Sequence, residues 1–318
     1  MELNIAYSSD DNYTKHLLVS MVSLLENNKE FEQINIYILS NGITKKNKQL
    51  LTDWCQKYNA NIQFTEFETI SDKVDTDGSF SKSAFGRLFL DDFIDKDKVL
   101  YLDCDSAVNG SYYELMQLDI SDWLACAVQD NVSAYFKQVI GMKKDDVYFN
   151  SGVILFNLKK WREENMQKKA MEFIKKFHGS VPHQDQGVFN AICYKRILRL
   201  HPKYNYQCPM FEYTPKQLQI MNPGYYSEQE LQEAKENPTF IHFTEGFSNR
   251  PWRDNCTHPN KDIYLRYRSM TPYSGELERA DINKNSLFVY KAYKMLPFPL
   301  YRLFLYIILK IKLIRNKK

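Results

Sequence analysis

The first half of the chain alternates short apolar runs with longer segments in which the apolar residues have helical spacing. The predicted strands are Leu3–Tyr7, Ile34–Leu39, Asn61–Phe67, Lys98–Leu102, Trp123–Val128 and Val153–Asn157. The predicted helices are Thr14–Leu25, Lys45–Tyr58, Ala84–Phe93 and the amphipathic segment Lys159–Phe177. Strands separated by helices in this way are typical of βαβ units, so the pattern predicts an α/β fold on a mostly parallel sheet.

The rest of the chain has a different character. Ser71–Ser83 is polar and is predicted to be a surface loop, and beyond about residue 200 the chain becomes rich in Pro, Tyr and Asn. There is no internal repeat and no low-complexity linker. We therefore predict one domain over residues 1–270 and a C-terminal arm over residues 271–318.

The C-terminal arm combines an apolar stretch with basic residues. Leu296–Leu309 is apolar apart from Arg302, and Lys310–Lys318 is half basic. A helix that crosses a bilayer needs about 20 apolar residues, more than this stretch offers. One interpretation is a helix at the membrane interface, with Lys and Arg on anionic lipid. The other is a helix packed on the body of the protein or on a partner.

The composition is that of a soluble globular protein, and the charge distribution argues against nucleic-acid binding. The 318 residues are 44% hydrophobic and 25% charged, as in soluble globular proteins. The net charge is +3, but eight basic and no acidic residues lie between Lys291 and Lys318, so the remainder is mildly acidic. A nucleic-acid-binding body is therefore not expected, because tracking phosphates needs basic charge on the folded surface.

The cysteines and the N-terminus indicate a compartment. No two of the six cysteines lie within four residues of each other, which excludes a zinc-binding Cys pair of the usual spacing. Met1–Tyr7 lacks the basic region and long apolar stretch of a signal peptide. We expect a cytoplasmic protein with reduced thiols, and with the arm on lipid it would be peripheral at the inner face of the cell membrane.

The strongest chemical signal is an acidic pair that directly follows an apolar run. In Val99–Asp105, the residues Asp103 and Asp105 are two apart, so in extended chain their carboxylates point the same way. Two close carboxylates are costly unless a cation lies between them, and oxygen ligands suit Mn²⁺ or Mg²⁺. Two solvated turn carboxylates are the alternative. A third ligand is offered by His242, which ends the apolar run Phe240–Ile241 and could otherwise be a core histidine.

A second polar cluster closes the first predicted strand. The segment Tyr7–Tyr13 contains Ser8, Ser9, Asp10, Asp11 and Asn12. Carboxylate and amide side chains there could hydrogen-bond to the edge of a nucleotide base. They could equally form a turn and cap the helix that begins near Thr14.

Several motifs in one order resemble those of the family 8 glycosyltransferases, above all the bacterial lipooligosaccharide galactosyl- and glucosyltransferases. The likeness covers roughly residues 1–265. It is carried by Asp10–Tyr13, Phe85–Leu88, Val99–Asp105, Tyr148–Val153, Asn157–Trp161, Gln184–Gln186, His242 and Arg250–Trp252. The resemblance implies the GT-A nucleotide-diphospho-sugar transferase fold, with a mixed central sheet flanked by helices. It also implies retaining transfer of a hexose from a UDP-sugar to a glycan, glycolipid or glycoprotein acceptor, with Mn²⁺ and possible use of Mg²⁺.

The same resemblance assigns roles to individual residues. It implies that the metal ligands are Asp103, Asp105 and His242. It implies that the donor is bound by Asp10, Asn12, Tyr13, Arg87, Asp103, Asn150 and Arg250. It implies that Gln186, Asp185 and Asp130 lie around the reacting sugar, with Gln186 beneath the anomeric carbon. An amide is a poor nucleophile, so we expect front-face attack, in which the departing phosphate takes the acceptor's proton.

The sequence also departs from the family pattern. The family often reads His-x-x-Gly-x-x-Lys-Pro-Trp, whereas the run from His242 to Trp252 is two residues longer and has Arg250 in place of lysine. Gly187 follows Gln186 where the galactosyltransferases have an acid, which leaves the donor open between glucose and galactose. Two other hypotheses are a haloacid-dehalogenase-like phosphatase, which also carries D-x-D after a strand, and a non-catalytic glycan- or UDP-sugar-binding member of the same fold.

Overall fold

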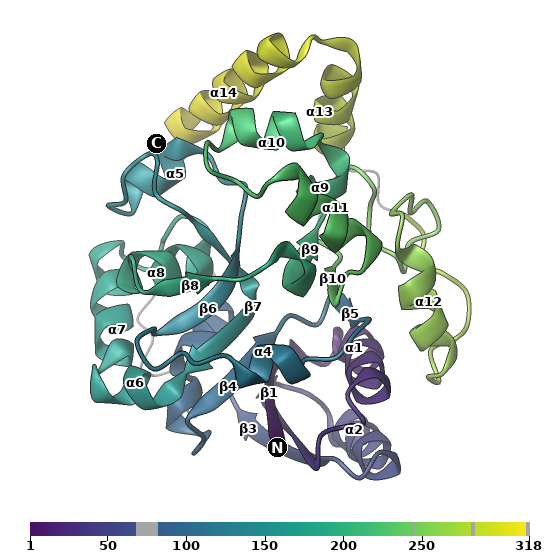
Figure 1. The fold of residues 1–318 in the computed structure, drawn as a ribbon. Coiled ribbons are helices and arrows are strands. Elements are labelled where there is room, and N and C mark those ends of the chain that lie inside the picture. The colour runs from purple at the N-terminus through teal and green to yellow at the C-terminus, as the bar shows by residue number, and fades with distance from the viewer. Residues whose placement is uncertain (68–81, 245, 281–283, 316–318) are drawn as a thin grey trace.

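The computed structural model describes residues 1–67, 82–244, 246–280 and 284–315. Its centre is a seven-stranded sheet in the order β3-β2-β1-β4-β7-β6-β8 (Figure 1). The strands are β1 Glu2–Asp10, β2 Gln33–Asn41, β3 Asn61–Glu66, β4 Lys98–Leu102, β6 Ala125–Gln129, β7 Phe149–Asn157 and β8 Ile197–Arg199. Only β7 pairs antiparallel with its neighbours, so the predicted mixed, mostly parallel sheet is confirmed.

The strands are apolar without alternation because both faces of the sheet are covered. On β4, Leu100 and Leu102 face one hydrophobic cluster, while Val99 and Tyr101 face another. This is the period of two that side chains follow in extended chain. Helices α1 (Thr14–Asn27) and α2 (Lys45–Lys57) pack on the first face. Helices α6 (Leu158–Glu163), α7 (Met166–Lys176) and α8 (Gln184–Ile192) cover the second.

The single helix predicted over Lys159–Phe177 is wrong, because the chain forms α6 and α7 with a break between them. Asn165 sits at the break in the left-handed region, with φ of 52°, a conformation that Asn tolerates better than most residues. In one straight helix, buried Trp161 of α6 would point roughly 180° away from the buried Ala170 face of α7. The break lets both apolar faces meet the same sheet.

The helix predicted over Ala84–Phe93 is instead a 3₁₀ helix, η1 (Lys82–Asp92), with a non-helical kink at Phe89. Residues three apart stack on one face of a 3₁₀ helix, and Phe85 and Leu88 are both fully buried. Most of the predicted loop Ser71–Ser83 lies outside the described residues.

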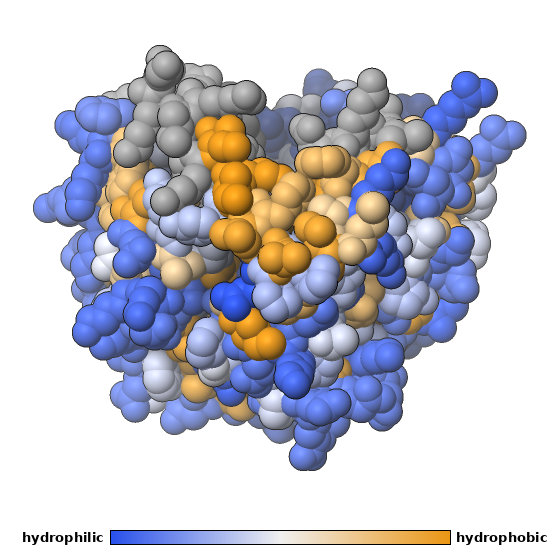
Figure 2. Space-filling view, turned by 90° about the horizontal axis from the view of Figure 1, so that it is seen from above, coloured by the Kyte–Doolittle hydropathy of each residue, from blue (hydrophilic) through white to orange (hydrophobic). Residues whose placement is uncertain are grey.

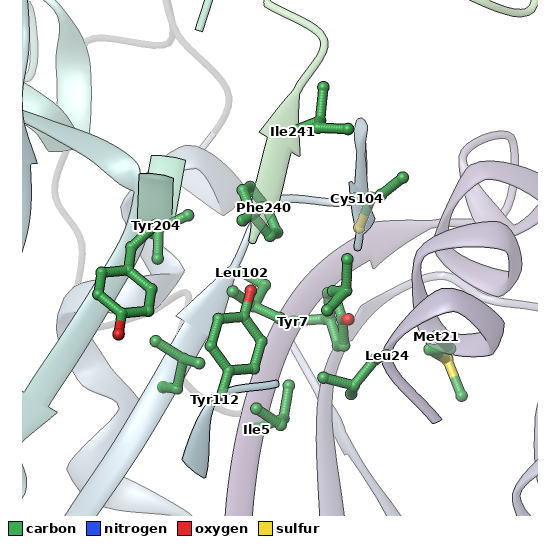
Figure 3. Close-up of a cluster of buried hydrophobic side chains, with 14 of the residues drawn as sticks. Ile5, Tyr7, Met21, Leu24, Leu102, Cys104, Tyr112, Tyr204, Phe240 and Ile241 are labelled. Atoms are coloured by element: carbon green, nitrogen blue, oxygen red, sulfur yellow. The ribbon is translucent and has the colours of Figure 1, made fainter. Parts of the chain in front are cut away.

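A smaller sheet stands at the carboxyl edge of the main one. Its order is β5-β10-β9, formed by β5 (Ser106–Val108), β10 (Phe240–His242) and β9 (Tyr206–Gln207). Figure 3 shows Phe240 and Ile241 of β10 lying among side chains of the same cluster as Tyr7 and Leu102. The remaining elements of the body are α4 Tyr113–Gln117, α5 Ala134–Val139, η2 Pro202–Asn205, α9 Pro209–Glu212, α10 Pro215–Met221, α11 Glu228–Glu236 and α12 Lys261–Ser269.

The C-terminal arm is a helical hairpin of α13 (Lys284–Met295) and α14 (Phe298–Arg315), drawn in yellow in Figure 1. One side packs on the body: Tyr293 donates to the Glu212 carbonyl at 3.1 Å, and the Tyr301 and Tyr213 hydroxyls lie 2.9 Å apart. Figure 2, which views this end of the molecule, shows apolar side chains gathered on its surface. No helix among the described residues is both long enough and apolar enough to cross a membrane.

Candidate active site

The polar residues predicted to bind a ligand gather at one edge of the main sheet. Asp10 ends β1, Asp103 follows β4 and Asp130 follows β6, and these parallel strands all end at the same edge. Antiparallel β7 begins there, which brings Asn150 beside them. A cavity of about 240 Å³ opens at this edge and is lined by Ser8, Ser9, Asp10, Tyr13, Asn41, Arg87, Tyr101, Asp103, Cys104 and Asp105. Ligands of open α/β sheets bind at this kind of edge.

The three predicted metal ligands meet there, although 137 residues separate Asp105 from His242 along the chain. Nε2 of His242 lies 3.1 Å from Oδ1 of Asp105 and 3.6 Å from Oδ2 of Asp103. The antiparallel pairing of β10 with β5 places His242 opposite Ser106, directly after the acidic pair. One ligand atom from each residue falls within 4.8 Å of the others. Two carboxylates and one imidazole form a donor set that fits a divalent cation such as Mn²⁺ or Mg²⁺.

The charges of the triad depend on one another. Burial disfavours the charged imidazole of His242, but the neighbouring Asp105 and Asp103 carboxylates outweigh it, so the pKa of His242 is raised. Burial also disfavours the Asp105 carboxylate, but His242 and Arg250 outweigh it and hold the pKa of Asp105 well below its usual range. Positive charge is therefore drawn to this site even in the protein alone.

Two arginines flank the triad. Arg87 is almost fully buried and pairs with Asp103 at 3.1 Å and with Asp185 at 3.0 Å. Burial opposes its charge, but the two carboxylates outweigh burial and raise the pKa of Arg87 above its already high value. Arg250 pairs with Asp105 and donates to the carbonyl of Phe243. Both guanidinium groups thus lie against the acidic pair, and Arg87 also lines the cavity.

A chain of side-chain hydrogen bonds extends from the triad toward α8. Gln186 and Asn150 both donate their amide N–H groups to Oδ2 of Asp130, at 2.9 and 3.2 Å. Oε1 of Gln186 accepts from the Ser151 backbone at 3.0 Å, so both ends of its amide are held. Asp185 is held by Arg87. The structure therefore brings together all the residues predicted to surround the donor sugar.

Some residues of the N-terminal polar cluster line the cavity, and some stabilise the turn after β1 or the start of α2. Asp10 and Tyr13 line the cavity, but Oδ1 of Asp10 also accepts from the backbone N–H of Tyr13 and closes the turn. Asp11 accepts from Thr44 and Asn47, at the start of α2. Asn12 is exposed and is not among the residues that line the cavity. Asn12 as a donor-binding residue stays a prediction.

Sequence reasoning missed several residues of this site. Tyr101, on the strand before the acidic pair, donates to Oδ1 of Asp103 at 3.0 Å. Asn41 lines the cavity from the end of β2, a place that the strand-end argument could have identified. Asn205, fully buried at the end of η2, lies 3.2 Å from Nδ1 of His242 and had no recognisable signal.

Gly152 holds β7 against the triad. Its carbonyl accepts from the Asp103 backbone at 2.8 Å, and its N–H donates to Oδ1 of Asn150 at 2.9 Å. A Cβ at this position would lie 2.7 Å from Nδ1 of His242 and 2.9 Å from Oδ2 of Asp103. Only glycine leaves room for Asp103 and His242, two of the predicted metal ligands.

Comparison with known proteins agrees with this geometry. Residues 4–256 match the family model for Glycosyl transferase family 8. General stress protein A of Bacillus subtilis is 30% identical over 280 residues, which cover 86% of this chain and 95% of the relative. The lipopolysaccharide 1,2-glucosyltransferase of Escherichia coli is 26% identical, over 85% of this chain and 79% of the relative.

Solved structures agree as well. The crystal structure of the galactosyltransferase LgtC in complex with donor and acceptor sugar analogues superposes with a TM-score of 0.70 at 25% identity, covering 86% of this chain and 96% of that one. The family match covers most of the chain and both ends of the site from Asp10 to His242. The protein is a member of glycosyltransferase family 8, with the GT-A fold.

Proposed function

We propose that this hexosyltransferase moves glucose or galactose from a UDP-sugar to a glycan acceptor, with retention of anomeric configuration and with the aid of a divalent cation. The observation that carries the proposal is the meeting of Asp103, Asp105 and His242 beside a cavity at the carboxyl edge of the sheet. Two of the similar proteins are named as a glucosyltransferase and a galactosyltransferase, which supports a hexose as the transferred group.

Asp103, Asp105 and His242 would hold the cation, which we expect to be Mn²⁺ and for which Mg²⁺ could substitute. A divalent cation bound there supplies positive charge to offset the negative charge that develops on the leaving diphosphate. Arg250 is already at this position, where it pairs with Asp105. A guanidinium can hold phosphate oxygens through two parallel hydrogen bonds, which makes Arg250 a suitable second contact for the diphosphate.

The sugar would lie between the triad and the start of α8. Asp130 and Asn150 offer hydrogen-bonding groups for its hydroxyls, and Asp185 adds a charge that Arg87 balances. Gln186 would face the anomeric carbon. Its amide is a weak nucleophile and its Oε1 already accepts from Ser151. These features support front-face attack, with the acceptor proton passing to the departing phosphate and the amide oxygen stabilising positive charge on the sugar ring.

The uridine would occupy the part of the cavity lined by Asp10, Tyr13 and Asn41. Tyr13 is 38% exposed and lines the cavity beside the rings of His16 and Trp252, so part of its side chain is accessible to a base. Asn41 offers both a donor and an acceptor. Asn12 is also proposed to contact the base, although it is exposed in the protein alone.

Binding of UDP in the presence of Mn²⁺ tests the proposal directly. We expect UDP with Mn²⁺ to raise the melting temperature of the wild type, because a ligand that binds only the folded state stabilises it. Asp105→Ala should lose this rise, while Asp145→Ala, which removes an exposed carboxylate, should keep it. A wild type that gains no stability from any UDP compound would refute the proposal.

Hydrolysis of a panel of nucleotide sugars, scored by released nucleotide, then identifies the donor. Turnover of UDP-glucose or UDP-galactose above the other sugars is the expected result. Binding of UDP-sugars without turnover on any acceptor would instead indicate a non-catalytic member. The family match sets the phosphatase hypothesis aside, and aryl phosphate hydrolysis serves as its control.

We further propose that the acceptor is a cell-surface glycan or glycolipid and that the hairpin α13–α14 docks on the cytoplasmic face of the cell membrane. A relative named for lipopolysaccharide supports such an acceptor. The exposed side of the hairpin carries the apolar residues Leu287, Phe288, Met295, Leu300, Leu303, Tyr306, Ile307 and Ile311. The basic residues Lys291, Lys294 and Arg302 lie on the same two helices.

Sedimentation with lipid vesicles tests the docking. Vesicles with anionic phosphatidylglycerol should carry the protein down, and neutral phosphatidylcholine vesicles should carry much less. Phe288→Glu together with Leu303→Glu should abolish sedimentation, whereas Val147→Glu, an exposed apolar position outside the hairpin, should not. Equal sedimentation of all three proteins would contradict the docking.

A further inference from the structure

A fully buried amide, Asn205, lies behind the imidazole of the metal triad. Its Oδ1 is 3.2 Å from Nδ1 of His242, and its Nδ2 donates to Oδ1 of Asn150 at 2.8 Å. Asn205 directly precedes β9, which pairs with β10 through Ile241 and His242. Backbone pairing therefore fixes Asn205 beside the histidine. This position is outside the set of ligands and donor-binding residues assigned above.

The direction of the hydrogen bonds in this region is determined by two groups that cannot change roles. The Asp130 carboxylate only accepts when ionised, so Asn150 must turn its Nδ2 toward it. The Gly152 backbone N–H only donates, so Asn150 must turn its Oδ1 toward it. Both requirements give Asn150 the same orientation. Oδ1 of Asn150 can then only accept from Asn205.

The orientation of Asn150 in turn fixes the orientation of Asn205 and the position of the proton on His242. Because Nδ2 of Asn205 faces Asn150, its Oδ1 faces His242 and can only accept. Nδ1 of His242 must carry a proton to satisfy it, which leaves the Nε2 atom directed at Asp103 and Asp105. The opposite tautomer would point two lone pairs at each other in a buried site, which is unfavourable because neither atom would then have a hydrogen-bond donor.

We propose that Asn205 is a positioning residue that holds His242 in the tautomer able to bind a metal through Nε2. The proposal rests on the metal dependence proposed above. A hydrogen-bond acceptor on the second ring nitrogen fixes the tautomer and the orientation of a metal-binding histidine, and loss of such a partner weakens metal binding by about 10- to 100-fold. Through Asn150 and Asn205, Asp130 thus affects the metal-binding histidine as well as the residues around the sugar.

Titration with Mn²⁺ alone, followed by electron paramagnetic resonance of the free ion, tests this without any turnover. Asn205→Leu keeps similar bulk but removes the acceptor, and should weaken Mn²⁺ binding about 10- to 100-fold. Asn205→Asp loses the N–H that Asn150 accepts but keeps an acceptor for Nδ1–H of His242, so it should retain clearly more Mn²⁺ affinity than Asn205→Leu. Asn28→Leu removes another fully buried amide, which donates to the Leu24 carbonyl and accepts from the Tyr112 backbone, and should leave Mn²⁺ affinity unchanged.

The tautomer itself can be observed in the wild type, which avoids any variant that fails to fold. With ¹⁵N-labelled histidine and ¹¹³Cd²⁺ in place of Mn²⁺, Nδ1 of His242 should show a one-bond coupling to a proton and Nε2 a coupling to cadmium. A proton on Nε2, or cadmium on Nδ1, would overturn the assignment. So would equal loss of Mn²⁺ affinity in both Asn205 variants, or wild-type affinity in Asn205→Leu. A wild type that binds neither metal would refute the proposed function, and the inference with it.

Discussion

Replacing Gly152 by alanine should disconnect the imidazole from the metal triad. The added Cβ would lie 2.7 Å from Nδ1 and even closer to Cε1 of His242. Carbon atoms in contact normally keep about 3.5–4.0 Å, so the ring must move by roughly 1 Å. The backbone of Gly152 cannot yield instead, because its N–H and carbonyl both hold the neighbouring strand-end residues.

That displacement is large on the scale of metal coordination. Ligand distances in protein metal sites hold to about ±0.2 Å, so a ring moved by roughly 1 Å no longer serves as a ligand. Loss of a supporting partner alone costs about 10- to 100-fold in affinity, so loss of the ligand should cost about 100-fold or more, near 3 kcal/mol. Overpacking should also lower the free energy of unfolding by about 1–3 kcal/mol.

The assay is a Mn²⁺ titration of folded Gly152→Ala, checked by circular dichroism, beside the wild type and a matched glycine variant. Gly275→Ala is the control, because a Cβ there would meet nothing within 4 Å. We expect the control to bind like the wild type and Gly152→Ala to bind at least about 100-fold more weakly. A folded Gly152→Ala with wild-type affinity would refute the geometry of the triad, and with it the requirement for glycine at this position.

Three further predictions concern His258, Arg250 and Tyr293. Burial lowers the pKa of His258 to about 3, so the unfolded chain takes up a proton at higher pH than the folded protein does. The free energy of unfolding should therefore fall as the pH drops below about 6.5, by about 2 kcal/mol at pH 5, and urea unfolding should show a smaller fall in His258→Gln. Arg250→Lys keeps the charge but not the planar fork, and should raise the donor KM about tenfold at saturating Mn²⁺; an unchanged KM would exclude Arg250 from donor binding. Tyr293→Ala removes a ring stacked on Phe247 and a hydrogen bond to Glu212, and should lower the free energy of unfolding by about 1–3 kcal/mol in a denaturant titration; no loss would mean that the hairpin does not pack on the body in solution.

Much of the main sheet could be predicted from the sequence because its strands are buried on both faces. Such strands are continuous apolar runs, and Lys98–Leu102 was predicted with its observed bounds. The acidic pair was predicted from the same signal, since a polar residue directly after a buried strand lies at the sheet edge. Asp130 has the same kind of place after β6, but the sequence assigned it only through the resemblance to the family.

The parts that could not be predicted depend on tertiary contacts. Within Lys159–Phe177, Asn165 is the one residue whose type favours a helix break. The break is required only because the apolar faces of α6 and α7 must both pack on the same sheet. Asn205 looks like a turn residue, and its role depends on two partners, Asn150 and His242, that are far away in the chain.

The second half of the chain did contain local signals that were not used. Ser227 and Glu230 form a capping box at the start of α11, and Thr214 and Gln217 form another at the start of α10. The spacing Ser/Thr-x-x-Glu/Gln marks such helix starts in sequence. The two short helices were thus accessible, whereas the short strands of the second sheet, β5 and β9, carry too few residues for a periodic pattern.

The proposed metal ligands are divided between two sheets, and this affects when the site can form during synthesis. A nascent chain that ends before β10 holds the acidic pair and all the strands of the main sheet but lacks the imidazole. Such a chain exposes two close carboxylates without their histidine partner, so it should bind cations weakly and loosely. Once His242 has emerged from the ribosome and joined them, a bound cation would link the early and the late parts of the polypeptide, and its removal by a chelator should loosen the two sheets from each other.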